Sequence, residues 1–178
     1  IVTAAERHNR PGIFTSLIGW EWTSTPTGAN LHRVVITPDG ADKATQFLPF
    51  GSEISQYPQD LWAWLAKAEE RTGSRFMAIP HNSNLSKGYM FGEVTLEGKK
   101  ITPDYAQTRM FYEPIVEVTQ IKGDSESLPN SANDSFADFE TYEHYLQAYS
   151  STYSAKPGDY VRSALKTGLS ISADIGIN

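Results

Sequence analysis

The fold class is decided by one stretch, Phe14-Thr15-Ser16-Leu17-Ile18-Gly19-Trp20-Glu21-Trp22. Alternate positions place Phe14, Ser16, Ile18, Trp20 and Trp22 on one face of an extended segment, and Glu21 on the other face. Such period-two alternation of large apolar side chains is typical of a strand with one buried face. We therefore predict a strand that ends close to Glu21.

The rest of the chain alternates between predicted strands and helices. We expect strands at residues 31–37, 76–79 and 114–121, the last two of them buried, and a hairpin at 93–101. We expect helices at residues 57–72, 103–111, 136–149 and 159–166, the last one ending at Gly168. This alternation predicts an α/β fold in a single domain or domain fragment of 178 residues.

Composition excludes several classes of protein. The absence of cysteine excludes a disulfide scaffold, a thiolate zinc site and a cysteine nucleophile. A net charge of −6 without any Lys/Arg run argues against nucleic-acid binding. No apolar run approaches the roughly 18 residues of a membrane span, so none is expected.

Three residues stand out as possible metal ligands. Glu21 lies between large apolar neighbours, where a carboxylate is costly unless it is paired, protonated or metal-bound. His32 shares a strand face with apolar residues, and His81 follows a predicted buried strand, at the end where ligands gather in α/β sheets. A solvent-facing Glu, a hydrogen-bonded core His and a surface loop His are the alternatives. Together the three form a carboxylate-plus-two-imidazole set, which suits zinc, manganese or iron.

A fourth polar segment follows the predicted strand at 114–121. Glu117 interrupts a run of Ile and Val, and Lys122-Gly123-Asp124 comes directly after the run. A solvated turn explains this pattern. Alternatively, Lys122 is a cation aimed at an anionic substrate, with Glu117 as a metal ligand or as its support.

The order of these motifs resembles the polymerase-and-histidinol-phosphatase (PHP) superfamily of metal-dependent phosphoesterases. In that family a Gly-x-Glu-x segment supplies a metal-bridging carboxylate, and Gly19-Trp20-Glu21-Trp22 is similar to it. Two later histidine ligands of the family are matched by His32, eleven residues on, and by His81. The resemblance implies that the chain is part of a distorted (β/α)7-type barrel.

Residues 19–24, 30–33, 60–65 and 116–126 more closely resemble a PHP-related bacterial domain-of-unknown-function family of longer proteins. The His-x-His motif that opens PHP proteins and the Asp-x-His motif that closes them are absent, and neither His8 nor His144 replaces them. We therefore expect that this chain is truncated at both ends, and that the two motifs lie before Ile1 and after Asn178. The resemblance also favours an exported protein.

The resemblance implies hydrolysis of a small anionic, phosphorylated substrate by a metal-activated water, with Glu21 and His81 as catalytic residues. The substrate-binding or supporting residues that it implies are Arg33, Asn82, Glu117, Lys122 and Asp124. Arg33 and Lys122 are expected to clamp phosphate oxygens, and Asn82 to orient His81 or the substrate.

Two alternatives remain open. A non-catalytic module could bind sugars or peptides on an aromatic platform that includes Trp20 and Trp22, since the chain has four Trp, nine Tyr and eight Phe. The chain could also be an inert piece of a hydrolase that is active only at full length. Divalent-metal dependence separates the first alternative from a hydrolase, because a binding module keeps its ligand in chelator.

Overall fold

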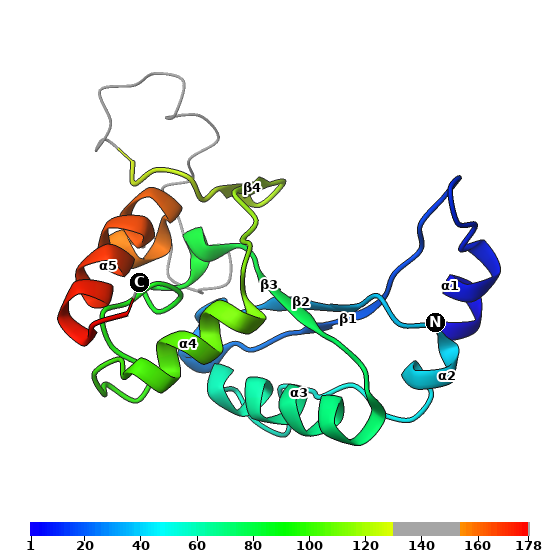
Figure 1. The fold of residues 1–178 in the computed structure, drawn as a ribbon. Helices are drawn as coiled ribbons and strands as arrows, with labels where there is room; N and C mark the ends of the chain where they lie inside the picture. Colours follow the sequence, from blue (N-terminus) through cyan, green and yellow to red (C-terminus); the bar gives the residue numbers. More distant parts are fainter. Residues whose placement is uncertain (130–153, 178) are drawn as a thin grey trace.

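The computed structural model describes residues 1–129 and 154–177, which form a mixed α/β fold (Figure 1). A three-stranded antiparallel sheet has the order β1-β2-β3, with bounds Ile18–Trp22, Arg33–Thr37 and Met77–Pro80. A separate two-stranded ribbon consists of β4 (Thr119–Gln120) and β5 (Gly123–Asp124). The helices are α1 (Val2–His8), α2 (Ala41–Ala44), α3 (Pro58–Thr72), α4 (Pro103–Tyr112) and α5 (Val161–Ile175).

The hydrophobic core lies between α3 and one face of the sheet. Trp22 and Val35 from the strands pack with Leu61, Trp62 and Leu65 from α3 in one buried cluster. These α3 residues recur at helical spacing, which places them on one face of the helix. Pro58 at the first turn and Gly73 in the left-handed conformation after the last turn set the two ends of α3.

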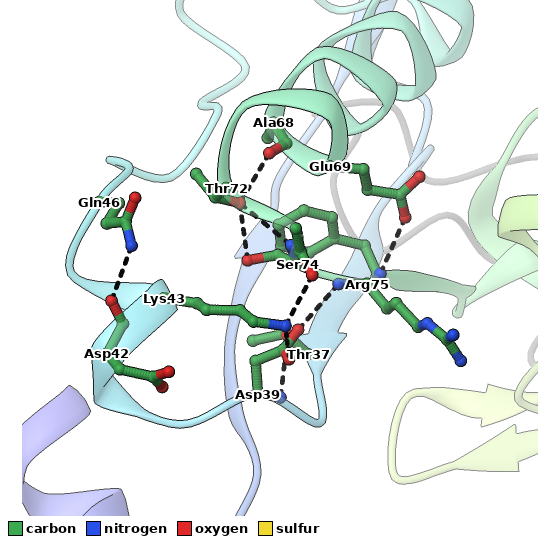
Figure 2. Close-up of polar contacts among 12 residues, drawn as sticks. Thr37, Asp39, Asp42, Lys43, Gln46, Ala68, Glu69, Thr72, Ser74 and Arg75 are labelled. Atoms are coloured by element: carbon green, nitrogen blue, oxygen red, sulfur yellow. Dashed lines mark hydrogen bonds and ion pairs between the residues drawn. The ribbon is translucent and has the colours of Figure 1, made fainter.

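A polar network stabilises the end of the sheet that lies opposite to His32 and His81 (Figure 2). The Asp39 carboxylate accepts hydrogen bonds from Thr37 Oγ1, Lys43 Nζ and the Arg75 N–H at 3.0, 2.8 and 2.8 Å. Burial alone would raise the pKa of Asp39, but these hydrogen bonds outweigh it and lower that pKa. Lys43 also donates to the Gly73 carbonyl, which ties α2 to the end of α3.

Several sequence predictions need correction. The predicted buried strand at 114–121 is largely exposed, with Ile121 at 89%, and only β4 within it is a strand. The predicted hairpin at 93–101 is reduced to a single bridge between Val94 and Lys100. Helix α5 continues through Gly168 to Ile175, because a glycine weakens a helix without necessarily ending it.

Three further predictions concern the fold class, one helix and membrane spans. The predicted α/β class is confirmed, but the sheets within residues 1–129 and 154–177 do not close into a barrel. The predicted helix at 136–149 lies outside the described residues. None of the described helices has the length and apolar character needed to cross a membrane.

Candidate metal centre

The strand register places Glu21, His32 and His81 on one face of the sheet. Glu21 pairs with Val34, and successive residues alternate between faces, so His32 lies on the same face as Glu21. The His81 N–H donates to the His32 carbonyl at 3.3 Å, which continues the β2–β3 ladder by one residue. Because β1 and β3 both run antiparallel to β2, their C-terminal ends meet the start of β2, and the three side chains gather there.

The three side chains converge on a single carboxylate oxygen. Oε1 of Glu21 lies 3.0 Å from Nδ1 of His32 and 3.2 Å from Nε2 of His81. Each residue offers one ligand atom, and these atoms all lie within 4.8 Å of one another. Ligand atoms about 2.0–2.2 Å from one tetrahedral ion lie roughly 3–4 Å apart, so the spacing suits one ion.

Hydrogen bonding explains how His81 presents its ring. Nδ1 of His81 lies 3.4 Å from the Ile79 carbonyl and Nε2 lies 3.2 Å from Oε1 of Glu21, so both ring nitrogens face hydrogen-bond acceptors. A neutral imidazole carries one ring proton, so it can donate to only one of these two acceptors. In the tautomer with the proton on Nδ1, the Nε2 lone pair is available to a cation beside Glu21.

The environment of His32 also favours a neutral metal ligand. The residue is buried, and neither of its ring nitrogens makes a hydrogen bond of suitable geometry. Burial lowers the pKa of His32 from 6.5 to about 4, against the opposing effect of Glu21. A buried, neutral imidazole whose Nδ1 lies 3.0 Å from the Glu21 carboxylate fits a divalent cation, which requires neutral histidine.

Two other predicted site residues lie next to this group. Asn82 directly follows His81, is buried, and adopts the left-handed conformation with φ 52°. Lys122 is exposed, and its Nζ lies 3.4 Å from Asn82 Oδ1. The charge of Lys122 also contributes to the lowered pKa of His32, so this cation faces the metal-ligand candidates.

Arg33 lies elsewhere than the sequence predicts. It pairs in the sheet with Trp22 and Pro80, and its guanidinium stacks over the Trp22 ring on the core side. Its Nε donates to Glu113 Oε1 at 2.9 Å, so the side chain is buried in an ion pair. The expected phosphate clamp at Arg33 is therefore not available at the face that carries the histidines.

Glu117 and Asp124 are outside the group of three. Glu117 accepts a hydrogen bond from Gln120 Nε2 at 2.6 Å, and its backbone N–H donates to the Pro80 carbonyl. Asp124 is buried in the β4–β5 ribbon, and burial raises the pKa of its carboxyl group. These contacts give both residues a local role in the loop that carries Lys122.

Two polar residues near the histidines were not predicted. Asn30 and Ser83 are completely buried, and their polar side-chain atoms lack hydrogen-bond partners. Asn30 lies two residues before His32, and Ser83 lies two residues after His81. The spacing of Asn30 from His32 was the available sequence signal, because residues i and i+2 of an extended segment share a face.

The two tryptophans expected in an aromatic platform, Trp20 and Trp22, do not lie on this face. Trp22 is completely buried, and its Nε1 donates to the Ser55 carbonyl. Trp20 packs edge-on against Trp64 and Phe76 and donates to the Phe50 carbonyl. Both tryptophans thus belong to the core side of the sheet, where they cannot stack on a ligand beside Glu21.

Comparison with known proteins gives one match. The chain matches the family described as "Protein of unknown function (DUF3604)" over residues 1–178. No curated protein and no solved structure shows significant similarity to it. Because the match covers the whole chain, this protein belongs to the DUF3604 family.

Proposed function

We propose that this chain carries the metal site of a metal-dependent hydrolase, most specifically a phosphoesterase. The observation that carries the proposal is the convergence of His32 Nδ1 and His81 Nε2 on Oε1 of Glu21. A divalent zinc, manganese or iron ion held by these three residues would supply Lewis acidity and lower the pKa of a neighbouring water. The similarity of the motif order to the PHP superfamily supports the same reaction and a PHP-like barrel as the complete fold.

The residues of this chain would prepare the site in three ways. In the tautomer that donates from Nδ1 to the Ile79 carbonyl, the Nε2 lone pair of His81 would point at the site. His32 stays neutral because burial lowers its pKa, so no proton competes for its lone pair at neutral pH. Glu21 supplies negative charge, and its side chain is 45% exposed, which leaves the site open to solvent and substrate.

The substrate we propose is a small phosphorylated molecule. Lys122 is the cation described beside the group of three, and its position next to Asn82 would direct it at a phosphate oxygen. Such a cation would attract the anionic substrate, and it would also stabilise the negative charge that develops during hydrolysis. Arg33 takes no part in this proposal, because its guanidinium is committed to Glu113.

The first experiment measures metal binding by calorimetry with Zn²⁺ and with Mn²⁺. We expect His81→Ala and Glu21→Gln each to weaken binding by at least about 10- to 100-fold, the loss that already follows when an outer-shell partner of a metal ligand is changed. His8→Ala is the matched control, because His8 is exposed and does not belong to the group of three candidate ligands. Equal affinity in His81→Ala and His8→Ala would refute the metal site.

The second experiment measures turnover in the full-length protein. We expect hydrolysis of p-nitrophenyl phosphate or bis(p-nitrophenyl) phosphate to be lost in chelator and restored by Mn²⁺ or Zn²⁺. His81→Ala should abolish turnover while circular dichroism and urea unfolding change little. Unchanged turnover in this variant would contradict the assignment of His81, and metal binding without hydrolysis of either ester would contradict the phosphoesterase.

A further inference from the structure

A concave pocket lies between α4 and α5. This pocket has a volume of about 340 Å³, within the range of small-molecule sites. Its walls are mainly apolar, with Tyr105 and Met110 from α4 and with Leu165 and Ile171 from α5. Because Glu21, His32 and His81 are not part of its lining, the pocket is separate from the candidate metal centre.

The polar part of the pocket is formed by Arg109 and Glu113. Arg109 Nε donates to Glu113 Oε2 at 3.1 Å, and Arg109 Nη2 donates to the Met90 carbonyl at 2.9 Å. Glu113 also binds Arg33, so one carboxylate is shared by two guanidinium groups. Burial alone would raise the pKa of Glu113, but the two arginines lower it, and the carboxylate is ionised.

The charges of this network do not cancel. Arg33 and Arg109 contribute two positive charges and Glu113 contributes one negative charge, which leaves one positive charge in excess. The Arg109 side chain is 24% exposed and lines the pocket, whereas Arg33 is almost completely buried. The excess charge is therefore accessible at Arg109, in surroundings that strengthen its attraction for an anion.

A glycine in the interior of α5 leaves space in this pocket, although glycine is unfavourable in a helix. Gly168 lines the pocket from the interior of α5, where glycine costs about 1 kcal/mol relative to alanine. A Cβ atom added at Gly168 would meet no atom within 4 Å. The apolar rim is also exposed, with Leu165 at 66%, and such exposed apolar surface marks binding sites.

We propose that the pocket between α4 and α5 binds a small amphipathic carboxylate. The apolar body of the ligand packs between the two helices, and its carboxylate pairs with the Arg109 guanidinium. Arginine suits this role because its planar guanidinium matches the geometry of a carboxylate. A neutral molecule of the same shape gains only the apolar contacts, so the pocket distinguishes the two by charge.

The test uses 2-naphthoate and its neutral analogue 2-naphthamide as probes, titrated by fluorescence or calorimetry. We expect the wild-type protein to bind 2-naphthoate at least tenfold more tightly than 2-naphthamide. Arg109→Met should remove this preference while the Glu113–Arg33 pair persists. Equal binding of the two probes to the wild-type protein, or no binding of either, would overturn the proposal.

A second variant tests the pocket without changing any charge. Gly168→Leu places a side chain in the open space and improves helix propensity, so the fold should be retained. We expect it to weaken 2-naphthoate binding at least tenfold, whereas Ser170→Leu, at an exposed α5 position outside the pocket lining, should not. Circular dichroism and urea unfolding confirm that both variants fold.

Two further outcomes would reject the proposal. Equal 2-naphthoate affinity in Gly168→Leu and Ser170→Leu would show that the probe binds elsewhere. A wild-type dimer that Gly168→Leu dissociates would show that a second copy of the chain covers the pocket. Neither outcome bears on the metal centre, whose affinity for Zn²⁺ is measured separately.

Discussion

Arg33 Nε lies 2.9 Å from Glu113 Oε1, and this ion pair joins β2 to the C-terminal end of α4. Both side chains are only 2% exposed. The same carboxylate oxygen accepts a hydrogen bond from Trp62 Nε1 at 2.9 Å, which adds α3 to the connection. His32 directly precedes Arg33 and lies on the opposite face of the sheet. The network on the core side therefore fixes the backbone of β2 next to the candidate ligand His32.

Glu113→Gln tests the strength of this network. The substitution leaves two guanidinium groups without their buried counter-charge, so we expect the free energy of unfolding to fall by about 3–5 kcal/mol. Urea unfolding followed by circular dichroism measures the change. Glu97→Gln is the control, because the Glu97–Lys99 pair is exposed and screened by solvent, so its loss should change the free energy of unfolding little. Similar losses in the two variants would contradict the role of Glu113.

The lowered pKa of His32 predicts a pH dependence of stability in the metal-free protein. Between pH 6.5 and about 4, the unfolded chain binds a proton at His32 that the folded protein does not bind. The contribution of His32 to the free energy of unfolding is therefore complete above pH 6.5 and declines as the pH falls towards 4. Urea unfolding at several pH values, with chelator present, measures this slope.

His32→Gln removes this titration and is expected to flatten the slope between pH 6.5 and 4. His8→Gln is the matched control, since His8 is exposed and its substitution should leave the slope unchanged. A slope in His32→Gln equal to that of the wild-type protein would show that other groups cause the pH dependence.

Two substitutions separate the backbone and side-chain roles of Asn82. Asn82 has φ 52°, a conformation that glycine adopts freely and that alanine adopts at a cost of about 1–2 kcal/mol. We therefore expect Asn82→Ala to be less stable than Asn82→Gly in thermal unfolding. Both variants remove the contact with Lys122, so both should raise KM for a phosphorylated substrate if Asn82 positions that cation. Equal stability of the two variants would contradict the backbone argument.

Gly19→Ala tests the close approach of β1 and β2. A Cβ atom at Gly19 would lie 2.5 Å from the Val35 carbonyl oxygen, which belongs to the backbone of the paired strand. The strands must separate to admit it, and we expect a loss of about 1–3 kcal/mol in the free energy of unfolding. Gly168→Ala is the control: it meets no neighbour and should stabilise α5 by about 0.5–1 kcal/mol. A neutral Gly19→Ala would contradict this packing.

The candidate ligands were predictable because each signal was local. Alternation put Glu21 opposite the tryptophans, and the end of an apolar run put His81 at the end of β3. The spacing of Leu61 and Leu65 likewise predicted α3 and its buried face. These patterns depend on the geometry of a single strand or helix, which a short sequence specifies.

The placement of Arg33 was not predictable in the same way. An arginine beside a candidate ligand suits a phosphate clamp, and only the pairing with Trp22 shows that it faces the core. Its partner Glu113 lies 80 residues away in the sequence. The exposure of residues 114–121 was not predictable either, because an apolar run does not show whether another element covers it.

The sequence by itself determined the residue types of the candidate site, the α/β alternation and the strand that carries Glu21. The tertiary structure decided that Glu21, His32 and His81 share one face, that Arg33 is committed to Glu113, and that α4 and α5 enclose a pocket. Local structure follows from steric preferences and hydrophobic periodicity within a few residues. The convergence of Glu21, His32 and His81 depends on the register between strands and on burial by distant segments. The chain acquires both only when it folds.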